Sequence, residues 1–343
     1  TPFRERADRA VALRESGINL TTTASYDHEA VRALVADIAA YVTRDPIDAQ
    51  IQSFDYATRT FSFTESQPGV TLDQDLLYER VTAALDRWES GVTVTVDPIV
   101  TEPAVTKDEL VASFGLVAAY TTETTNDSNR NTNIDLACQA INGTALMPGE
   151  TFSFNQATGQ RTTEKGYKSA GAIAAGQSIE EVGGGICQVS STLFNAVARA
   201  NLEIVSRSPH AWPSTYVNIG EDATVNWPNL DFQFKNNTNS PIFIITYYKD
   251  RRMSAEIWGM SLGEGVTIDL QSTVIKTIDP PSEIKYELNT ELPYGTEKTT
   301  VKARTGYVVE TEKVWYKDGQ ETSRELLHTS NYRAYQQVIE YNY

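Results

Sequence analysis

The hydrophobic pattern of this chain changes several times between helical spacing and strict alternation, so one type of element cannot account for it. The 343 residues also exceed the roughly 250 to 300 residues at which a single core usually stops growing. We therefore expect a multidomain α+β protein. Its parts are a small α+β domain over residues 1–107, a mixed α+β domain over 108–270 and a small all-β module over 271–343.

The N-terminal part combines helical and strand patterns. Residues 27–42 place apolar side chains at helical spacing after Asp27, a residue type that often caps a helix N-terminus. Residues 49–66 predict a β-hairpin, residues 73–91 a second helix and residues 92–100 an alternating strand. The proline-containing segment that follows predicts a linker to the central part.

The central part begins with helical patterns and ends with strand patterns. One helix is expected over residues 131–144 and another over the apolar segment that follows a run of three glycines. Beyond it the alternation predicts strands over 222–227, 230–238, 241–249 and 252–259.

Charge and hydropathy exclude several classes of partner. The formal net charge is −16, and no basic run is interleaved with aromatic residues, so a nucleic acid backbone would be repelled overall. No apolar run approaches the roughly 20 residues that span a bilayer. Because the chain begins without Met, we expect an export signal or membrane anchor upstream of it, and contact with a membrane only through that anchor.

Cys187, one of two cysteines in the chain, is a candidate nucleophile. A thiol attacks only as the thiolate, so a nucleophilic cysteine needs a lowered pKa and an accessible sulfur. The sequence GGGIC places Cys187 in or just before the first turn of a predicted helix. Unpaired amides and the helix dipole there stabilise a nearby anion by about 0.3–1 kcal/mol when it is exposed.

Gly183, Gly184 and Gly185 are candidate substrate-binding residues. Glycine adopts positive φ angles and leaves room for a substrate backbone to approach the sulfur. The amides of these glycines are also candidate donors to an oxyanion. The alternative is a simple flexible turn, because the run lacks the lysine of a phosphate-binding loop and the fingerprint of a dinucleotide loop. We expect no cofactor.

A nucleophilic thiol needs a partner that exchanges protons near neutral pH, and histidine suits this best. Of the three histidines, His210 follows the Cys187 helix, and an antiparallel return would bring it back over the helix N-terminus. His28 and His328 are expected to be solvated. The scattered histidines and unpaired cysteines also predict no metal site.

Other interpretations of the cysteines stay open. Free cysteine is among the most buried residue types, so a packing role for Cys187 is about as common as a catalytic one. Cys138 lies within the predicted helix and is expected to pack there, but a Cys138–Cys187 disulfide is a further alternative. The alternating Asp and Asn side chains over 127–135 resemble calcium ligands, yet Thr132 and Cys138 stand where an EF-hand loop needs Gly and Glu.

Seven motifs occur in order along the central part: SNRNTNI (128–134), INGTALMPGETFSFN (141–155), GQRTTEKGY (159–167), GGGICQVSSTLFNAV (183–197), LEIVSRSPH (202–210), DATV (222–225) and LDFQFKNNTNSPIFI (230–244). Together they resemble the VanW family of bacterial envelope proteins. Residues 17–106 resemble the peptidoglycan-binding domain often found ahead of VanW, through DPIDAQIQSFD and PGVTLDQDLL. The C-terminal segment resembles the G-five domain through ELPYGTEK and YKDGQET, but lacks most of that family's repeated glycines.

The resemblance implies an exported protein of the Gram-positive cell wall whose partners are peptidoglycan stem peptides and glycan. The VanW family is linked to L,D-transpeptidation, which joins stems through diaminopimelate residues, and its proposed nucleophile corresponds to Cys187. In the implied mechanism Cys187 attacks a tetrapeptide stem, releases D-alanine and passes the acyl group to an amine. His210 is the candidate acid and base, Asp222 the candidate group that orients it, and Arg161 a candidate holder of a stem carboxylate.

Two other functions are compatible with the same sequence. Water as the acceptor would make the site a carboxypeptidase. Two of the three resemblances are to binding modules, so the alternative is a non-enzymatic peptidoglycan-binding protein in which Cys187 only packs.

Overall fold

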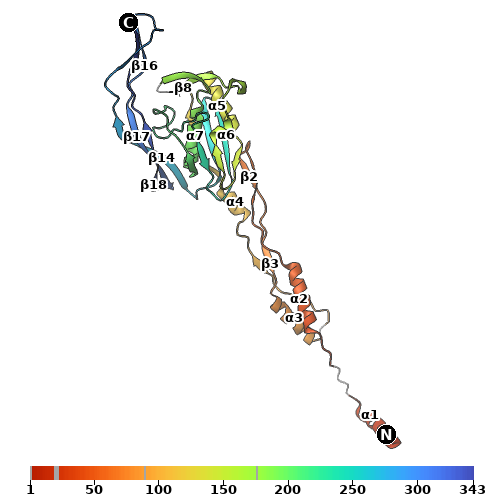
Figure 1. Cartoon of the computed structure of the whole chain (residues 1–343). Helices are drawn as coiled ribbons and strands as arrows, with labels where there is room; N and C mark the ends of the chain where they lie inside the picture. The colour runs from red at the N-terminus through yellow and green to blue at the C-terminus, as the bar shows by residue number, and fades with distance from the viewer. Residues whose placement is uncertain (1, 19–22, 89, 175–176) are drawn as a thin grey trace. The chain divides into compact units, whose positions relative to one another are not determined.

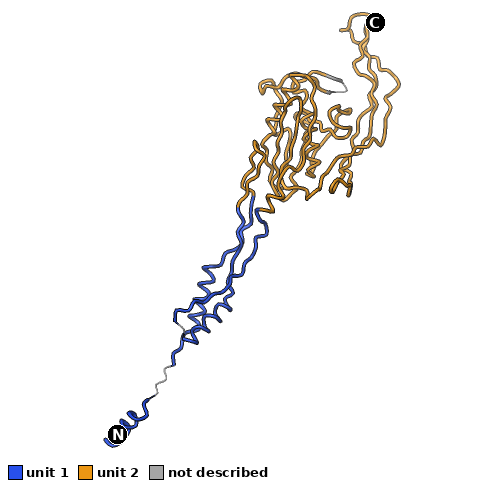
Figure 2. Tube along the Cα trace, turned by 180° about the vertical axis from the view of Figure 1, so that it is seen from behind, with its two compact units in different colours: residues 1–50, 65–107 blue, residues 51–64, 108–343 orange. Residues whose placement is uncertain are grey.

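The computed structural model describes residues 2–18, 23–88, 90–174 and 177–343. Contacts group the chain into two compact units, residues 1–50 with 65–107 and residues 51–64 with 108–343 (Figure 2). The predicted hairpin belongs to the second unit, although the expected N-terminal domain included it. The expected boundary after residue 270 falls inside a continuous strand, β14 (Val266–Ile278). The central part and the C-terminal module lie in the same compact unit.

The first unit contains the following described elements: α1 (Phe3–Ser16), α2 (His28–Val42), β3 (Gly69–Thr71), α3 (Gln74–Asp86) and β4 (Ile99–Thr101) (Figure 1). Asp27 caps α2 as predicted, because its side chain accepts the amide N–H of Glu29 at 2.8 Å. The strand predicted over 92–100 is wrong for most of its length. Only its C-terminal end pairs with another strand. Residues 99–101 form β4, which pairs with the three-residue strand β3.

The predicted hairpin forms from β1 (Ile51–Asp55) and β2 (Thr60–Phe63). It packs through aromatic side chains on a four-stranded sheet of the second unit, in the order β5 (Phe114–Glu123), β13 (Arg252–Met260), β12 (Ile242–Lys249), β6 (Thr144–Leu146). The Phe54 ring lies 4.8 Å from that of Phe243 and 5.7 Å from that of Trp258. Burial of these rings explains why residues 51–64 fold with the second unit.

Helices α5 (Ser128–Ile141) and α7 (Ile186–Arg199) pack on the same sheet, α5 against β12 and α7 against β5 and β13. Successive strand residues point to opposite faces. Ile244 of β12 joins the helix core, whereas the adjacent Phe243 meets the hairpin. Almost every side chain of α7 is buried, which fixes the helix tightly in the second unit.

The rest of the central part consists of short elements: α4 (Lys107–Ser113), β7 (Thr151–Ser153), α6 (Phe154–Thr158), the 3₁₀ turn η1 (Thr163–Lys165), β8 (Ser169–Ala174), β9 (Gln177–Val182), β10 (Glu203–Ser206) and β11 (Gln233–Lys235). The strands predicted over 241–249 and 252–259 are confirmed as β12 and β13. The strand predicted over 222–227 is wrong. Its backbone bonds to the Ser191 side chain and the Ser208 carbonyl instead of a neighbouring strand.

The C-terminal β module, residues 271–343, is all β as predicted. Strands β14, β17 (Gly306–Lys317) and β18 (Gln320–Tyr332) form one antiparallel sheet, and β15 (Lys285–Leu288), β19 (Val338–Asn342) and β16 (Thr296–Val301) form another. The expected α+β class is confirmed for the whole chain. Among the described residues, no helix has both the length and the apolar character needed to span a membrane.

Replacing Phe54 by alanine should destabilise the second unit by about 3 kcal/mol, because it removes a buried ring from the hairpin interface. Leu326→Ala is the matched control: this side chain of β18 is exposed, and its loss should change the free energy of unfolding by less than about 0.5 kcal/mol. Urea unfolding of the full chain measures both. Equal stabilities of Phe54→Ala and the unchanged protein would contradict the packing of the hairpin on the sheet.

Candidate functional site

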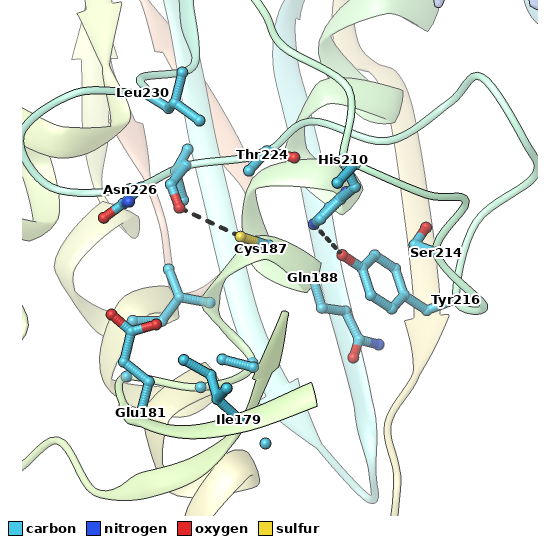
Figure 3. A pocket seen from close by; sticks show the side chains of 18 of the residues that line it. Ile179, Glu181, Cys187, Gln188, His210, Ser214, Tyr216, Thr224, Asn226 and Leu230 are labelled. Atoms are coloured by element: carbon cyan, nitrogen blue, oxygen red, sulfur yellow. Dashed lines mark hydrogen bonds between the residues drawn. The ribbon is translucent and has the colours of Figure 1, made fainter. Parts of the chain in front are cut away.

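Cys187 lies in the first turn of α7, as predicted, because the helix begins at Ile186 after the N-cap residue Gly185. Its half-buried sulfur lines a cavity of about 1070 Å³ and contacts the Val225 carbonyl oxygen at 3.4 Å (Figure 3). Both cysteines are free, so the Cys138–Cys187 disulfide is excluded. Cys138 is buried in the core, as expected.

The glycine run fits closely around its neighbours. Gly183 and Gly185 have φ angles of 91° and 106°, which side chains rarely adopt. A Cβ on Gly184 would overlap the Ala170 carbonyl oxygen. The Asn133 side chain also donates to the Gly184 carbonyl at 2.9 Å. All three glycines line the cavity, so their small size brings the backbone to the cavity surface.

Two of the three glycine amides expected as oxyanion donors are not free to serve as such. The Gly183 amide donates to Lys168 at 3.0 Å and the Gly184 amide to Glu181 at 3.1 Å, so both are already paired. Among the described residues, the amide of Cys187 has no such acceptor, as is usual in the first turn of a helix. The Gly185 amide has no acceptor within the described part of the chain either, so the amides of Gly185 and Cys187 are the donors available to an oxyanion.

His210 and Asp222 form a buried pair beside the sulfur. The Nδ1 atom of His210 lies 2.5 Å from Asp222 Oδ2, and the backbone N–H of His210 donates to the same oxygen at 2.7 Å. Their exposed fractions are 7% and 1%. The other ring nitrogen, Nε2, lies 3.4 Å from the Tyr216 hydroxyl (Figure 3), and His210 also interacts with the Cys187 thiol. The structure thus brings together the three side chains expected from the sequence.

The three groups shift one another's pKa values. Burial alone would raise the pKa of Cys187, but the hydrogen bond and charge of His210 outweigh it and lower that pKa. Burial disfavours the charged form of His210, yet Asp222 and Cys187 raise its pKa to about 9. Burial opposes ionisation of Asp222 too, while His210, Arg207 and Tyr332 lower its pKa to about 2. The arrangement therefore favours the charged forms of all three groups: the Cys187 thiolate, the His210 imidazolium and the Asp222 carboxylate.

Two further residues hold Asp222, and neither was expected from the sequence. Its Oδ1 atom accepts hydrogen bonds from Arg207 Nη2 at 3.0 Å and from the Tyr332 hydroxyl at 2.5 Å. Arg207 lies three residues before His210, within the motif LEIVSRSPH, so the motif contained a signal. Tyr332 lies in the C-terminal β module, and nothing in the sequence pattern connects it with Asp222.

Arg161 lines the cavity with its guanidinium unpaired. Its Nε, Nη1 and Nη2 atoms are buried and have no hydrogen-bond partner among the described residues. Buried polar groups are normally paired, so three unused donors are unusual. Burial lowers the pKa of Arg161, and the Phe154 ring lies 5.6 Å from Cζ. A planar carboxylate matches this fork of donors.

The other two histidines lie outside the cavity lining. His28 is exposed, as expected, and its Nδ1 atom lies 2.8 Å from the Tyr78 hydroxyl. The expectation for His328 was wrong: it is partly buried, its Nε2 atom lies 2.8 Å from the Gly220 carbonyl oxygen, and burial lowers its pKa to about 4. In the part of the chain that the structure describes, no three His, Cys, Asp or Glu side chains gather as metal ligands.

Three protein families match parts of the chain. Residues 129–258 match "VanW like protein", residues 1–93 match "Putative peptidoglycan binding domain", and residues 271–342 match "G5 domain". The resemblances noted in the sequence are confirmed by these matches.

Individual proteins are similar to longer parts of the chain. The uncharacterized protein YoaR of Bacillus subtilis is 35% identical over 275 residues, 79% of this chain and 86% of YoaR. The vancomycin B-type resistance protein VanW of Enterococcus faecalis is 30% identical over 135 residues, 38% of this chain and 49% of that protein. Among solved structures, the G5 domain of an IgA1 protease is 22% identical with a TM-score of 0.16, and covers 23% of this chain and 92% of its own.

The lowered pKa predicts selective reaction of Cys187 with iodoacetamide at pH 6, below the ordinary thiol pKa of about 8.5. Cys138 should not react in the folded protein, because burial raises its pKa. His210→Ala removes the groups that lower the pKa of Cys187, so labelling at pH 6 should fall at least about tenfold, the change in thiolate fraction per pKa unit. Mass spectrometry of peptides measures both sites. Equally slow labelling of the two cysteines would contradict an ion pair between the Cys187 thiolate and the His210 imidazolium.

Proposed function

Because this chain belongs to the VanW family of cell-wall-associated proteins, we propose that it is a peptidoglycan L,D-transpeptidase whose nucleophile is Cys187. The observation that carries the proposal is the thiol of Cys187 beside the His210–Asp222 pair in one cavity. The match to a peptidoglycan-binding domain supports a function at the cell wall. The proposal places the protein outside a Gram-positive cell, with stem peptides and glycan as partners; an upstream anchor stays a prediction.

The first step of the proposed reaction forms a thioester. The Cys187 thiolate attacks the carbonyl carbon of the L,D-peptide bond in a donor tetrapeptide, and the bond to D-alanine breaks. The departing amine takes a proton from the His210 imidazolium, so D-alanine leaves neutralised. Asp222 keeps the imidazole oriented through Nδ1, which leaves Nε2 for this proton transfer.

The negative charge that develops on the carbonyl oxygen needs donors close to the sulfur. The unpaired amide of Cys187 and the positive end of the α7 dipole supply them. Removing one oxyanion donor from an enzyme typically costs about 10²–10³-fold in kcat. The glycine run contributes space for the substrate backbone, whereas its Gly183 and Gly184 amides stay bonded within the loop.

The second step transfers the acyl group. The side-chain amine of an acceptor stem attacks the thioester carbon, neutral His210 takes the amine proton, and the Cys187 thiolate leaves. The product is an amide between two stems. If water attacks instead, the same groups release a shortened stem, and the protein acts as an L,D-carboxypeptidase.

The rival function is peptidoglycan binding without catalysis. The matches to a peptidoglycan-binding domain and a G5 domain favour it. A binding protein has no need of a low thiol pKa, however, and the buried Arg207, Asp222 and His210 network costs several kcal/mol of desolvation per ion before pairing offsets it. We therefore prefer the enzyme.

Dimer formation from purified disaccharide tetrapeptide, followed by mass spectrometry, tests the nucleophile. Cys187→Ala should lower the initial rate by roughly 10⁴-fold or more, as loss of a nucleophile does in other enzymes. Cys138→Ala is the matched control, since it removes the other thiol at a buried position outside the cavity lining, and should keep most of the activity. Full activity of Cys187→Ala would exclude Cys187 as the nucleophile. Tight peptidoglycan binding by the unchanged protein without turnover would support the binding function instead.

Arg161→Gln should raise KM for the stem about tenfold, because a hydrogen bond to a charged group contributes roughly 1.5–3 kcal/mol. The matched substrate is the same stem with its carboxylates amidated. If Arg161 holds a carboxylate, the variant and the unchanged protein should bind the amidated stem alike. An equal loss of affinity for both substrates would assign Arg161 a purely structural role.

A further inference from the structure

We propose that the C-terminal β module is part of the catalytic site, and that Tyr332 is a positioning residue that holds Asp222 where it orients His210. The inference rests on the proposed function of Cys187. It assigns to this module a role at the reacting groups that its match to a G5 domain does not imply.

The segment that carries Asp222 is bound to the module at Gly220. The Gly220 amide donates to the Tyr332 hydroxyl at 2.8 Å, and that hydroxyl donates to Asp222 Oδ1 at 2.5 Å. One phenol oxygen therefore connects the backbone at Gly220 with the carboxylate two residues later. Tyr332 is 1% exposed, so water does not replace either bond.

The Gly220 carbonyl is held from the same side. It lies 2.8 Å from His328 Nε2 and accepts from Thr311 Oγ1 at 3.3 Å, both in the module, and from Arg207 Nη2 at 2.8 Å. The lowered pKa of His328 keeps its ring neutral, so Nε2–H acts as the donor to this carbonyl. A Cβ on Gly220, whose φ is 93°, would lie 2.6 Å from Thr311 Oγ1. The segment at Gly220 therefore packs against the module so closely that no side chain fits at this position.

Arg207 extends the contact to Ser330. Its Nη1 atom donates to the Ser330 hydroxyl at 2.6 Å, while Nη2 donates to Asp222 Oδ1 at 3.0 Å. Both Ser330 and Tyr332 lie in β18, two residues apart, and so point to the same face of the sheet. One strand of the module therefore supplies the Tyr332 hydroxyl to Asp222 Oδ1 and also binds Arg207, the other donor to that oxygen.

The loop after His210 is attached to the module as well. The Arg333 amide donates to the Ala211 carbonyl at 3.1 Å, and the Trp212 ring meets that of Tyr335 at 5.8 Å and the Arg304 guanidinium at 4.2 Å. The module thus binds the backbone beside each residue of the His210–Asp222 pair, at Ala211 and at Gly220. An ordinary domain contact would not need to place a buried hydroxyl on the carboxylate itself.

Tyr332→Phe in the full chain tests the inference, with the pH dependence of Cys187 alkylation as the readout. Without the hydroxyl, the Asp222 carboxylate loses a bond that holds it against His210 Nδ1. A carboxylate that is less well placed stabilises the His210 imidazolium less, and the imidazolium then stabilises the thiolate less. The acidic limb of the profile should therefore move upward by roughly half to one pH unit, and the rate on that limb should fall about 3- to 10-fold. Tyr316→Phe is the matched control: its hydroxyl, in the same module, binds Gln271, and the profile should not change.

An unchanged profile in folded Tyr332→Phe would overturn the inference. If Tyr332→Phe does not fold, Ser330→Ala decides, because it loosens Arg207 and should shift the limb in the same direction; an unshifted limb overturns the proposal. Failure of the proposed function looks different. Cys187 of the unchanged protein would then show no selective reaction at pH 6, whatever the variants do.

Discussion

The buried hydrogen bond between His210 and Asp222 is the interaction on which the rest of the site depends. A carboxylate that is 1% exposed loses several kcal/mol of hydration, and only close partners of opposite charge and direct donors offset that loss. Arg207 and Tyr332 occupy one carboxylate oxygen, and His210 occupies the other. The imidazolium stabilised in this way then stabilises the Cys187 thiolate. Each charged group is stabilised by its neighbour of opposite charge.

Helix α7 fixes the distance between Cys187 and Asp222, the first and last of these three charged groups. Its first turn carries Cys187, and its buried polar residues bind the segment that leads to and from Asp222. Ser190 donates to the Ala223 carbonyl at 2.6 Å, and Asn195 donates to the Glu221 carbonyl at 2.8 Å. These side chains explain why a helix with no exposed face still contains Ser and Asn: each one satisfies a buried carbonyl. The nucleophile and the carboxylate are thus positioned by the same element.

Local patterns predicted the parts of the structure that local chemistry determines. The capped helix after Asp27, the hairpin, strands β12 and β13 and the position of Cys187 at a helix start all followed from periodicity and residue type. The segment after Asp222 alternates like a strand, but its partners are a serine side chain and a loop carbonyl, which periodicity does not reveal. The contact of Tyr332 with Asp222 spans 110 residues. Such a contact, like the burial of His328, is decided by tertiary packing alone.

The uninterrupted course of β14 limits how this protein can exchange parts in evolution. Domain shuffling usually proceeds at flexible linkers, where a new module can be joined with little regard to its orientation. Here the joint lies within β14, which pairs with β17 inside the module and also packs against α7 of the central part. A replacement module would therefore have to match both the packing against α7 and the tyrosine that binds Asp222, so the two parts are expected to be inherited together.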